Sequence, residues 1–268
     1  MSRVKMSPQT AADLWTAAHA AADAARVVTL ASFRKPGLSA ENKDQAGFDP
    51  VTVADRAAEA AIRAEIARLR PQDGILGEED AAKDGTSGLT WVIDPIDGTR
   101  GFLAGTPTWG VLIGLADAEG PVLGVIDQPY IGERFCGGLG EAFMTGPTGR
   151  TDLAARPARP LNDAIVFTTF PEVGTAQERA AFQRVAARAK LTRYGMDCYA
   201  YALIAAGQID LVIEAGLHPY DIMAPIAVIE AAGGIVTDWQ GGPAHHGGQV
   251  IAAANAQIHS EALALLDC

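Results

Sequence analysis

Two aspartates stand close together where a hydrophobic stretch changes character, in the sequence WVIDPIDGT at residues 91–99. A strand-like run leads into Asp94, Pro95 and Asp97, and a glycine–threonine pair follows. A surface turn uses proline and glycine but has no need of two carboxylates. One interpretation is a turn whose threonine caps a helix. The other is a ligand site, because α/β proteins bind ligands where strands end and helices begin.

Other acidic side chains occupy similar positions elsewhere in the chain. Glu78 follows a short strand-like run, Glu214 ends another, and Asp221 begins a helical pattern. Singly, each is more often a solvated carboxylate or a helix cap, and Asp55 is interpreted as an acid stabilised by a helix dipole. Two carboxylates ~4 Å apart repel by about 4 kcal/mol at an effective dielectric near 20, so convergence would require cations. Ligands that are all oxygen favour Mg²⁺ or Mn²⁺ over zinc.

Hydrophobic periodicity predicts the elements that would position these residues in the first half of the chain. Apolar residues at three- and four-residue steps predict helices over 10–33 and 58–69. Short apolar runs bounded by glycine and proline predict strands at 74–76, 89–93, 110–115 and 121–126, with hairpin material at 137–149.

The second half alternates more regularly between strand and helix patterns. Strands are predicted at 164–168, 191–195, 209–216, 235–238 and 250–254, and helices at 175–189, 197–207, 221–234 and from 260. The chain is therefore predicted to be α/β, with an α+β half at 1–155 and an α/β half at 156–268 within one compact domain.

Composition limits the possible partners and location. The chain has 268 residues and a net charge of −11, which argues against a general nucleic-acid binder. Its 3 cysteines are scattered without metal-ligand spacing, as expected of free thiols in a reducing compartment. With neither an apolar leader nor a long apolar run, the sequence predicts a cytoplasmic protein with no nucleic-acid or membrane partner.

Three motifs in this order resemble the inositol monophosphatase-like, Mg²⁺-dependent phosphatases: GEE, then WVIDPIDGT, then YDIMAPIAVIEAAGG. The resemblance extends from DPVTVAD to AAGGIVTDW, nearly the whole chain. It implies a layered α-β-α-β-α sandwich, a homodimer and a small phosphate monoester as substrate. It also implies two or three bound Mg²⁺ ions, with Mn²⁺ as a possible substitute.

The resemblance also assigns roles to particular residues. The implied metal ligands are the side chains of Glu78, Asp94, Asp97 and Asp221 and the carbonyl of Ile96. Gly98 and Thr99 would donate backbone N–H groups to the phosphate. Thr99 would orient the attacking water together with Asp49, and Glu78 would assist in taking its proton. Lys43 falls near a family lysine that approaches the site.

The segments between these motifs resemble the branch that hydrolyses L-histidinol phosphate in histidine biosynthesis. That substrate carries an ammonium and an imidazole, so its site should offer carboxylates beyond the metal ligands. Asp197 and Glu214 are the candidates, although Asp197 could instead be a helix cap. Tyr220 stands where many family members have a tryptophan, directly before the last metal aspartate. Both side chains are aromatic, so this wall of the site is expected to be preserved.

The expected reaction is direct hydrolysis by a metal-activated water, without a phospho-enzyme. An inositol monophosphatase or a broad sugar-phosphate phosphatase is the nearest alternative. A nucleotide bisphosphate phosphatase is disfavoured because the chain lacks an obvious insertion to hold a base. A catalytically silent regulator that binds metal or phosphate is the alternative from a different class.

Overall fold

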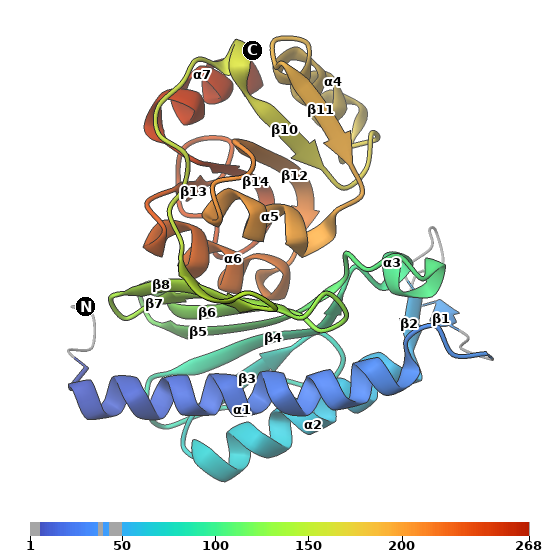
Figure 1. Cartoon of the computed structure of the whole chain (residues 1–268), viewed down its shortest axis with the longest axis vertical. Coiled ribbons are helices and arrows are strands. Elements are labelled where there is room, and N and C mark those ends of the chain that lie inside the picture. The colour runs from blue at the N-terminus through green and yellow to red at the C-terminus, as the bar shows by residue number, and fades with distance from the viewer. Residues whose placement is uncertain (1–5, 37–39, 43–49, 268) are drawn as a thin grey trace.

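Two β-sheets alternate with three layers of helices in the computed structural model, which describes residues 6–36, 40–42 and 50–267 (Figure 1). The helices are α1 (Pro8–Ser32), α2 (Val53–Leu69), α3 (Thr99–Ala104), α4 (Ala176–Ala186), α5 (Asp197–Ala205), α6 (Pro219–Ala231), α7 (Ala256–Leu266) and the 3₁₀ helix η1 (Leu161–Asp163). Within these ranges, none of the helices combines the length and hydrophobicity needed to cross a bilayer.

The first large sheet has seven strands in chain order, from β3 to β9. They are β3 (Gly74–Gly77), β4 (Thr90–Asp97), β5 (Gly110–Asp117), β6 (Gly120–Gln128), β7 (Glu133–Gly138), β8 (Glu141–Gly146) and β9 (Gly149–Asp152). Strand β3 runs parallel to β4, and the other neighbours are antiparallel. The parallel pair matters for function, because the carboxyl ends of β3 and β4 lie at the same edge.

The second large sheet has five strands in the order β11-β10-β12-β14-β13. They are β10 (Ile165–Thr168), β11 (Leu191–Tyr194), β12 (Leu211–Leu217), β13 (Ile235–Thr237) and β14 (Gly248–Ala253). A small antiparallel pair, β1 (Ala40–Asn42) and β2 (Pro50–Thr52), precedes α2. The predicted division between residues 155 and 156 falls between the two large sheets and stays a prediction.

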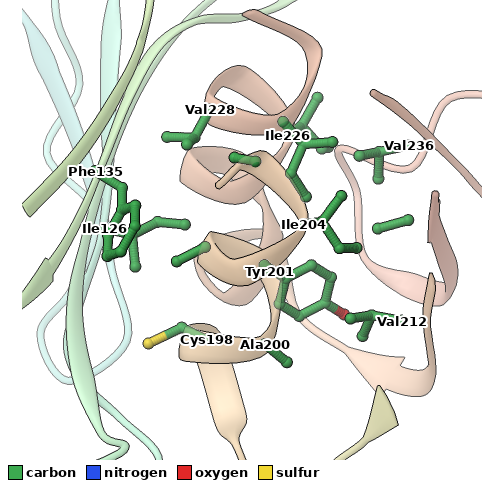
Figure 2. Packing of buried hydrophobic residues seen from close by; sticks show 14 of the residues in the cluster. Ile126, Phe135, Cys198, Ala200, Tyr201, Ile204, Val212, Ile226, Val228 and Val236 are labelled. Carbon is green, nitrogen blue, oxygen red and sulfur yellow. The ribbon is translucent and has the colours of Figure 1, made fainter. Parts of the chain in front are cut away.

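The layers are held together by helices with apolar faces. Helices α1 and α2 cover one face of the seven-stranded sheet, α5 and α6 lie between the sheets, and α4 and α7 cover the far face (Figure 1). Helices α5 and α6 pack against both sheets in the middle layer (Figure 2). Their contacts include Ile126 and Phe135 of the first sheet and Val212 and Val236 of the second. The predicted α-β-α-β-α sandwich is confirmed.

Glycines on three neighbouring strands allow α6 to lie very close to the first sheet. Gly114, Gly124 and Gly137 pair in register across β5, β6 and β7. A Cβ on Gly124 would come within 2.2 Å of the Ala224 carbonyl oxygen, and one on Gly137 within 2.4 Å of the Val228 Cα. The close approach fixes the position of α6, and with it the start of that helix.

Most predicted elements are present, with boundary differences that have local causes. Strand β4 continues through Asp97 rather than ending at residue 93, so Asp94 lies within the strand. Helix α7 begins at residue 256 rather than 260, because the Asn255 side chain accepts a hydrogen bond from the N–H of Ile258 and caps it.

Candidate active site

An irregularity at the end of β4 places Asp94 and Asp97 toward the same region. The pairing of β4 with β5 shifts register between these two residues. Within the irregular stretch, Asp94 Oδ1 accepts a hydrogen bond of 3.0 Å from the N–H of Ile96. A regular strand would place residues three apart on opposite faces, so the irregularity lets both carboxylates face one cavity.

Three aspartates from two elements converge at this point. Oxygens of Asp94, Asp97 and Asp221 all lie within 4.8 Å of one another. Asp221 stands in the first turn of α6, where its Oδ2 accepts a 2.6 Å hydrogen bond from the N–H of His218. Asp97 Oδ2 accepts a 2.6 Å hydrogen bond from the N–H of Cys198 in α5. Backbone N–H groups at the starts of α5 and α6, the helices between the two sheets, therefore hold the carboxylates of Asp97 and Asp221.

Glu78 joins the cluster because its strand runs parallel to that of Asp94. Gly77 at the end of β3 pairs with Ile93 of β4, so Glu78 follows beside Asp94. Burial raises the pKa of Asp94 well above its usual value, and the negative charges of Glu78, Asp97 and Asp221 raise it further. All four predicted side-chain ligands line one cavity of about 440 Å³.

The cluster has the chemistry of a divalent cation site. Burial also raises the pKa of Asp97, and the negative charges of Asp197 and Asp221 raise it further. Ionised carboxylates at such separations are stable together only when positive charge lies between them. The carboxylate donors are hard oxygens, and Ile96 lines the same cavity. Such a donor set fits Mg²⁺ or Mn²⁺.

The turn after β4 brings a helix start to the cavity. Gly98 has a left-handed conformation with a φ of 85°, and a Cβ there would lie 2.7 Å from the Asp197 Cγ. Only glycine suits both the backbone angle and the space. Thr99 then begins α3, and its hydroxyl donates to the Ile96 carbonyl at 3.2 Å.

Asp55 has a position that the sequence interpretation missed. Its Oδ2 accepts from the N–H of Thr52 at 2.8 Å, as expected of a helix-capping acid. Its other oxygen, Oδ1, lies 3.4 Å from the Thr99 hydroxyl, and the side chain is fully buried. The spacing of Thr52 and Asp55 is that of a capping box. No signal in the sequence therefore distinguishes an aspartate that only caps α2 from one that also contacts Thr99.

Two predicted residues lie outside the described part of the chain. The pairing of Thr99 with Asp49 and the approach of Lys43 therefore stay predictions. Within the described part, the acidic partner of the Thr99 hydroxyl is Asp55.

Asp197 and Glu214 form a second acidic side of the same cavity. Asp197 is the first residue of α5, after Met196 as the N-cap, and its Oδ2 lies 3.4 Å from the Thr108 hydroxyl. Glu214 Oε1 accepts two 2.8 Å hydrogen bonds, from the N–H and the hydroxyl of Thr169. Burial raises the pKa of Asp197, and it raises the pKa of Glu214 to about 7.

Aromatic and cationic side chains line the rest of the cavity. The Arg100 guanidinium lies 4.8 Å from the centre of the Phe170 ring, and Phe170 is 44% exposed. On another part of the wall the rings of His218 and Tyr220 stack with centres 5.1 Å apart. Tyr220 thus supplies the aromatic wall expected at its position.

Sequence and structure comparisons agree on the family. The model of the inositol monophosphatase family matches residues 11–267. A chloroplastic bifunctional phosphatase of Arabidopsis thaliana is 40% identical over 260 residues, which cover 93% of this chain and 73% of that protein. The histidinol-phosphatase of Streptomyces coelicolor is 35% identical over 257 residues, covering 93% of this chain and 95% of that one.

A solved structure supports the same assignment. An inositol monophosphatase from Zymomonas mobilis has a TM-score of 0.85 and 36% identity, covering 98% of this chain and 100% of that one. With the family model, the relatives and the acidic cluster in agreement, this chain belongs to the inositol monophosphatase family and is a metal-dependent phosphoric monoester hydrolase.

Proposed function

We propose that the enzyme hydrolyses L-histidinol phosphate to L-histidinol and inorganic phosphate. The observation that carries this proposal is the second acidic side of the cavity, formed by Asp197 and Glu214 beside the metal-ligand cluster. A substrate with an ammonium group gains from carboxylates that the metal does not neutralise. The 35% identity to the Streptomyces histidinol-phosphatase supports the same substrate.

On this proposal the phosphate end of the substrate lies at the aspartate cluster. Glu78, Asp94, Asp97, Asp221 and the Ile96 carbonyl would hold two or three Mg²⁺ ions. When bound, Mg²⁺ would neutralise phosphate charge and stabilise the departing alcohol oxygen. The N–H groups of Gly98 and Thr99 would bind phosphate oxygens at the start of α3.

The Thr99 hydroxyl is proposed to hold the attacking water, with Asp55 as its acidic partner because these two side chains are 3.4 Å apart. Water oxygen forms the new bond to phosphorus while the bond from phosphorus to the alcohol oxygen breaks. Glu78 is proposed to assist in taking the proton from the attacking water, and the departing alcohol oxygen gains a proton from solvent. No phospho-enzyme is required.

The other end of the substrate is proposed to contact Asp197 and Glu214. The ammonium would bind at these two carboxylates, which keeps Glu214 ionised despite its raised pKa. The imidazole would then lie toward the aromatic wall of Phe170 and Tyr220. Myo-inositol 1-phosphate has neither a cation nor an aromatic ring to use these groups.

A phosphate-release panel with and without Mg²⁺ tests the proposal. It compares histidinol phosphate, myo-inositol 1-phosphate and several sugar phosphates. We expect histidinol phosphate to have the highest kcat/KM and activity to require Mg²⁺. A higher kcat/KM for myo-inositol 1-phosphate would overturn the substrate assignment, and no Mg²⁺-dependent release from any ester would favour a silent regulator.

The variants Glu214→Gln and Asp197→Asn test whether these two carboxylates bind the ammonium group. Each should raise KM for histidinol phosphate about tenfold or more while changing KM for myo-inositol 1-phosphate little, since a charge-assisted contact contributes roughly 1.5–3 kcal/mol. Asp117→Asn is the matched control, because Asp117 lies at the end of β5 and does not line the cavity. Equal effects on both substrates would contradict the proposed contact.

An inositol monophosphatase is the second candidate. The 36% identity and full coverage of the Zymomonas inositol monophosphatase favour it.

A homodimer and a cytoplasmic location are also proposed. Light scattering coupled to size-exclusion chromatography tests the first, and fractionation of native cells tests the second.

A further inference from the structure

A buried glutamate outside the cavity holds the loop that carries Glu78. Glu59 lies in the middle of α2 and is only 1% exposed. Its Oε2 accepts a 2.8 Å hydrogen bond from the N–H of Glu79, and its Oε1 accepts a 3.0 Å hydrogen bond from the N–H of Asp80. These are the two peptide groups directly after Glu78, so one side chain fixes the backbone on that side of the ligand.

Arg63, one helical turn later, completes the contact. Its Nε donates to Glu59 Oε1 at 2.8 Å, and its Nη2 donates to the carbonyl oxygen of Asp80 at 3.0 Å. Asp80 is therefore held through both its N–H and its carbonyl. A buried carboxylate is unfavourable unless it is paired and hydrogen-bonded, and here Arg63 and the loop amides satisfy Glu59.

Gly77 allows the loop to lie directly against this pair. A Cβ at Gly77 would come within 2.2 Å of Glu59 Oε1 and 2.8 Å of Arg63 Nη2. The strand before the loop, β3, is at the edge of its sheet and ends at Gly77. The β3–β4 pairing stops at Gly77, and the chain next pairs with the sheet at Lys83, which bridges to Ile75. Between these two points the α2 side chains hold the backbone.

We propose that Glu59 and Arg63 are positioning residues that hold Glu78 where it can bind a divalent cation. Mg²⁺ demands near-ideal geometry from its ligands, and residues behind the ligands supply it. Asp94, Asp97 and Asp221 are fixed by a strand and a helix start, whereas Glu78 stands in a loop. The inference rests on the proposed metal site and adds how this chain builds one corner of it.

The variant Glu59→Gln tests the role because it keeps the shape of the side chain but turns one oxygen into a donor. Hydrogen exchange should become faster at the amides of Glu79 and Asp80. Mn²⁺ binding, followed by electron paramagnetic resonance of the free ion, should weaken about tenfold or more, as is typical when support behind a metal ligand is removed. The Mg²⁺ concentration for half-maximal activity should rise in parallel. KM for substrate at saturating Mg²⁺ should stay within about twofold.

Glu65→Gln is the matched control, since Glu65 pairs with Arg68 on the exposed side of the same helix. It should leave Mn²⁺ binding and loop exchange unchanged. Where Glu59→Gln does not fold, Arg63→Lys replaces it, because lysine keeps a positive charge beside Glu59 but cannot hold both Glu59 and the Asp80 carbonyl as the guanidinium does. Its Mn²⁺ binding should weaken in the same direction.

Two results would overturn the inference, and they are distinguishable. Faster exchange of the loop amides with unchanged Mn²⁺ affinity would make the Glu59–Arg63 pair purely structural. A wild-type protein that binds no Mn²⁺ would remove the proposed metal site itself, whatever the variants do.

Discussion

At the scale of single residues, the site consists of acidic side chains whose charged forms are disfavoured by burial and by one another. Asp94 is 3% exposed and is surrounded by three other acids, which raise its pKa after burial has done so. Each unneutralised pair at ~4 Å costs about 4 kcal/mol at a dielectric near 20. Such a cluster is costly to stability and is useful only if a cation occupies it.

The variant Asp94→Asn should lose nearly all activity, at least about 100-fold, while folding as well as the parent. Asparagine keeps the oxygen that accepts from the N–H of Ile96 and removes a charge that burial disfavours. Phosphate release and urea unfolding in the presence of a chelator measure the two effects. Full activity in this variant would exclude Asp94 as a metal ligand.

Glu214 should make stability depend on pH. Burial raises its pKa from an ordinary 4.5 to about 7 in the folded protein. A raised folded-state pKa means that its contribution is fully present below pH 4.5 and is lost as the pH rises through 7. Relative to Glu214→Gln, the parent should lose roughly 3 kcal/mol of unfolding free energy between pH 4.5 and 8.

Urea unfolding of both proteins in chelator across this pH range measures the difference. Glutamine can keep both hydrogen bonds from Thr169, because both end on the same oxygen, Oε1. The comparison therefore isolates ionisation. A difference that is independent of pH would show that Glu214 titrates normally.

At the scale of elements, the site depends on how closely α6 lies to the first sheet. Asp221 begins this helix and Asp94 lies in β4 of that sheet, so the separation of helix and sheet sets the separation of the two carboxylates. The glycines at 114, 124 and 137 set that distance by leaving no side chain between them.

The variant Gly124→Ala should push α6 away from the sheet, since its Cβ would meet the Ala224 carbonyl only 2.2 Å away. We expect a loss of about 1–3 kcal/mol in unfolding free energy, typical of an overpacked core. The Mg²⁺ requirement for activity should rise too, because Asp221 moves with its helix. Urea unfolding and Mg²⁺ titration measure the two changes.

Gly146→Ala is the control for this variant. It lies at the end of β8, where the nearest atom to a new Cβ is the flexible Glu133 side chain at 3.3 Å. It should change neither stability nor the Mg²⁺ requirement. Equal effects of the two substitutions would contradict the proposed spacing role of Gly124.

At the scale of the whole molecule, the acidic cluster should couple folding to divalent cations. The chain has a net charge of −11, and part of that charge is gathered in one cavity. A ligand that binds only the folded state stabilises it by about 2.7 kcal/mol at 100 times its Kd. Mg²⁺ should therefore raise Tm in a saturable way.

Calorimetry with increasing MgCl₂ measures this rise, with NaCl at equal ionic strength to separate screening from binding. Asp94→Asn should lose most of the Mg²⁺-specific rise while keeping the effect of NaCl. Identical Tm curves for the two salts would show that the cavity does not bind Mg²⁺ in preference to Na⁺.

The sequence alone determined the kind of chemistry and the local structure around it. The motifs around Glu78, Asp94 and Asp221 indicated the family, and helix starts such as Thr52 with Asp55 follow from capping rules that involve only neighbours. Apolar periodicity gave most elements in order, because it reflects which face of each element must be buried.

Only the tertiary structure decided which distant groups meet. Asp55 reaches Thr99 across 44 positions of sequence, and Glu59 reaches Glu79 across 20. Neither contact has a local signature, because a helix acid has the same spacing whether its second oxygen points to water or to another element. The raised pKa of Glu214 likewise depends on burial, which is a property of the packed layers rather than of any one segment.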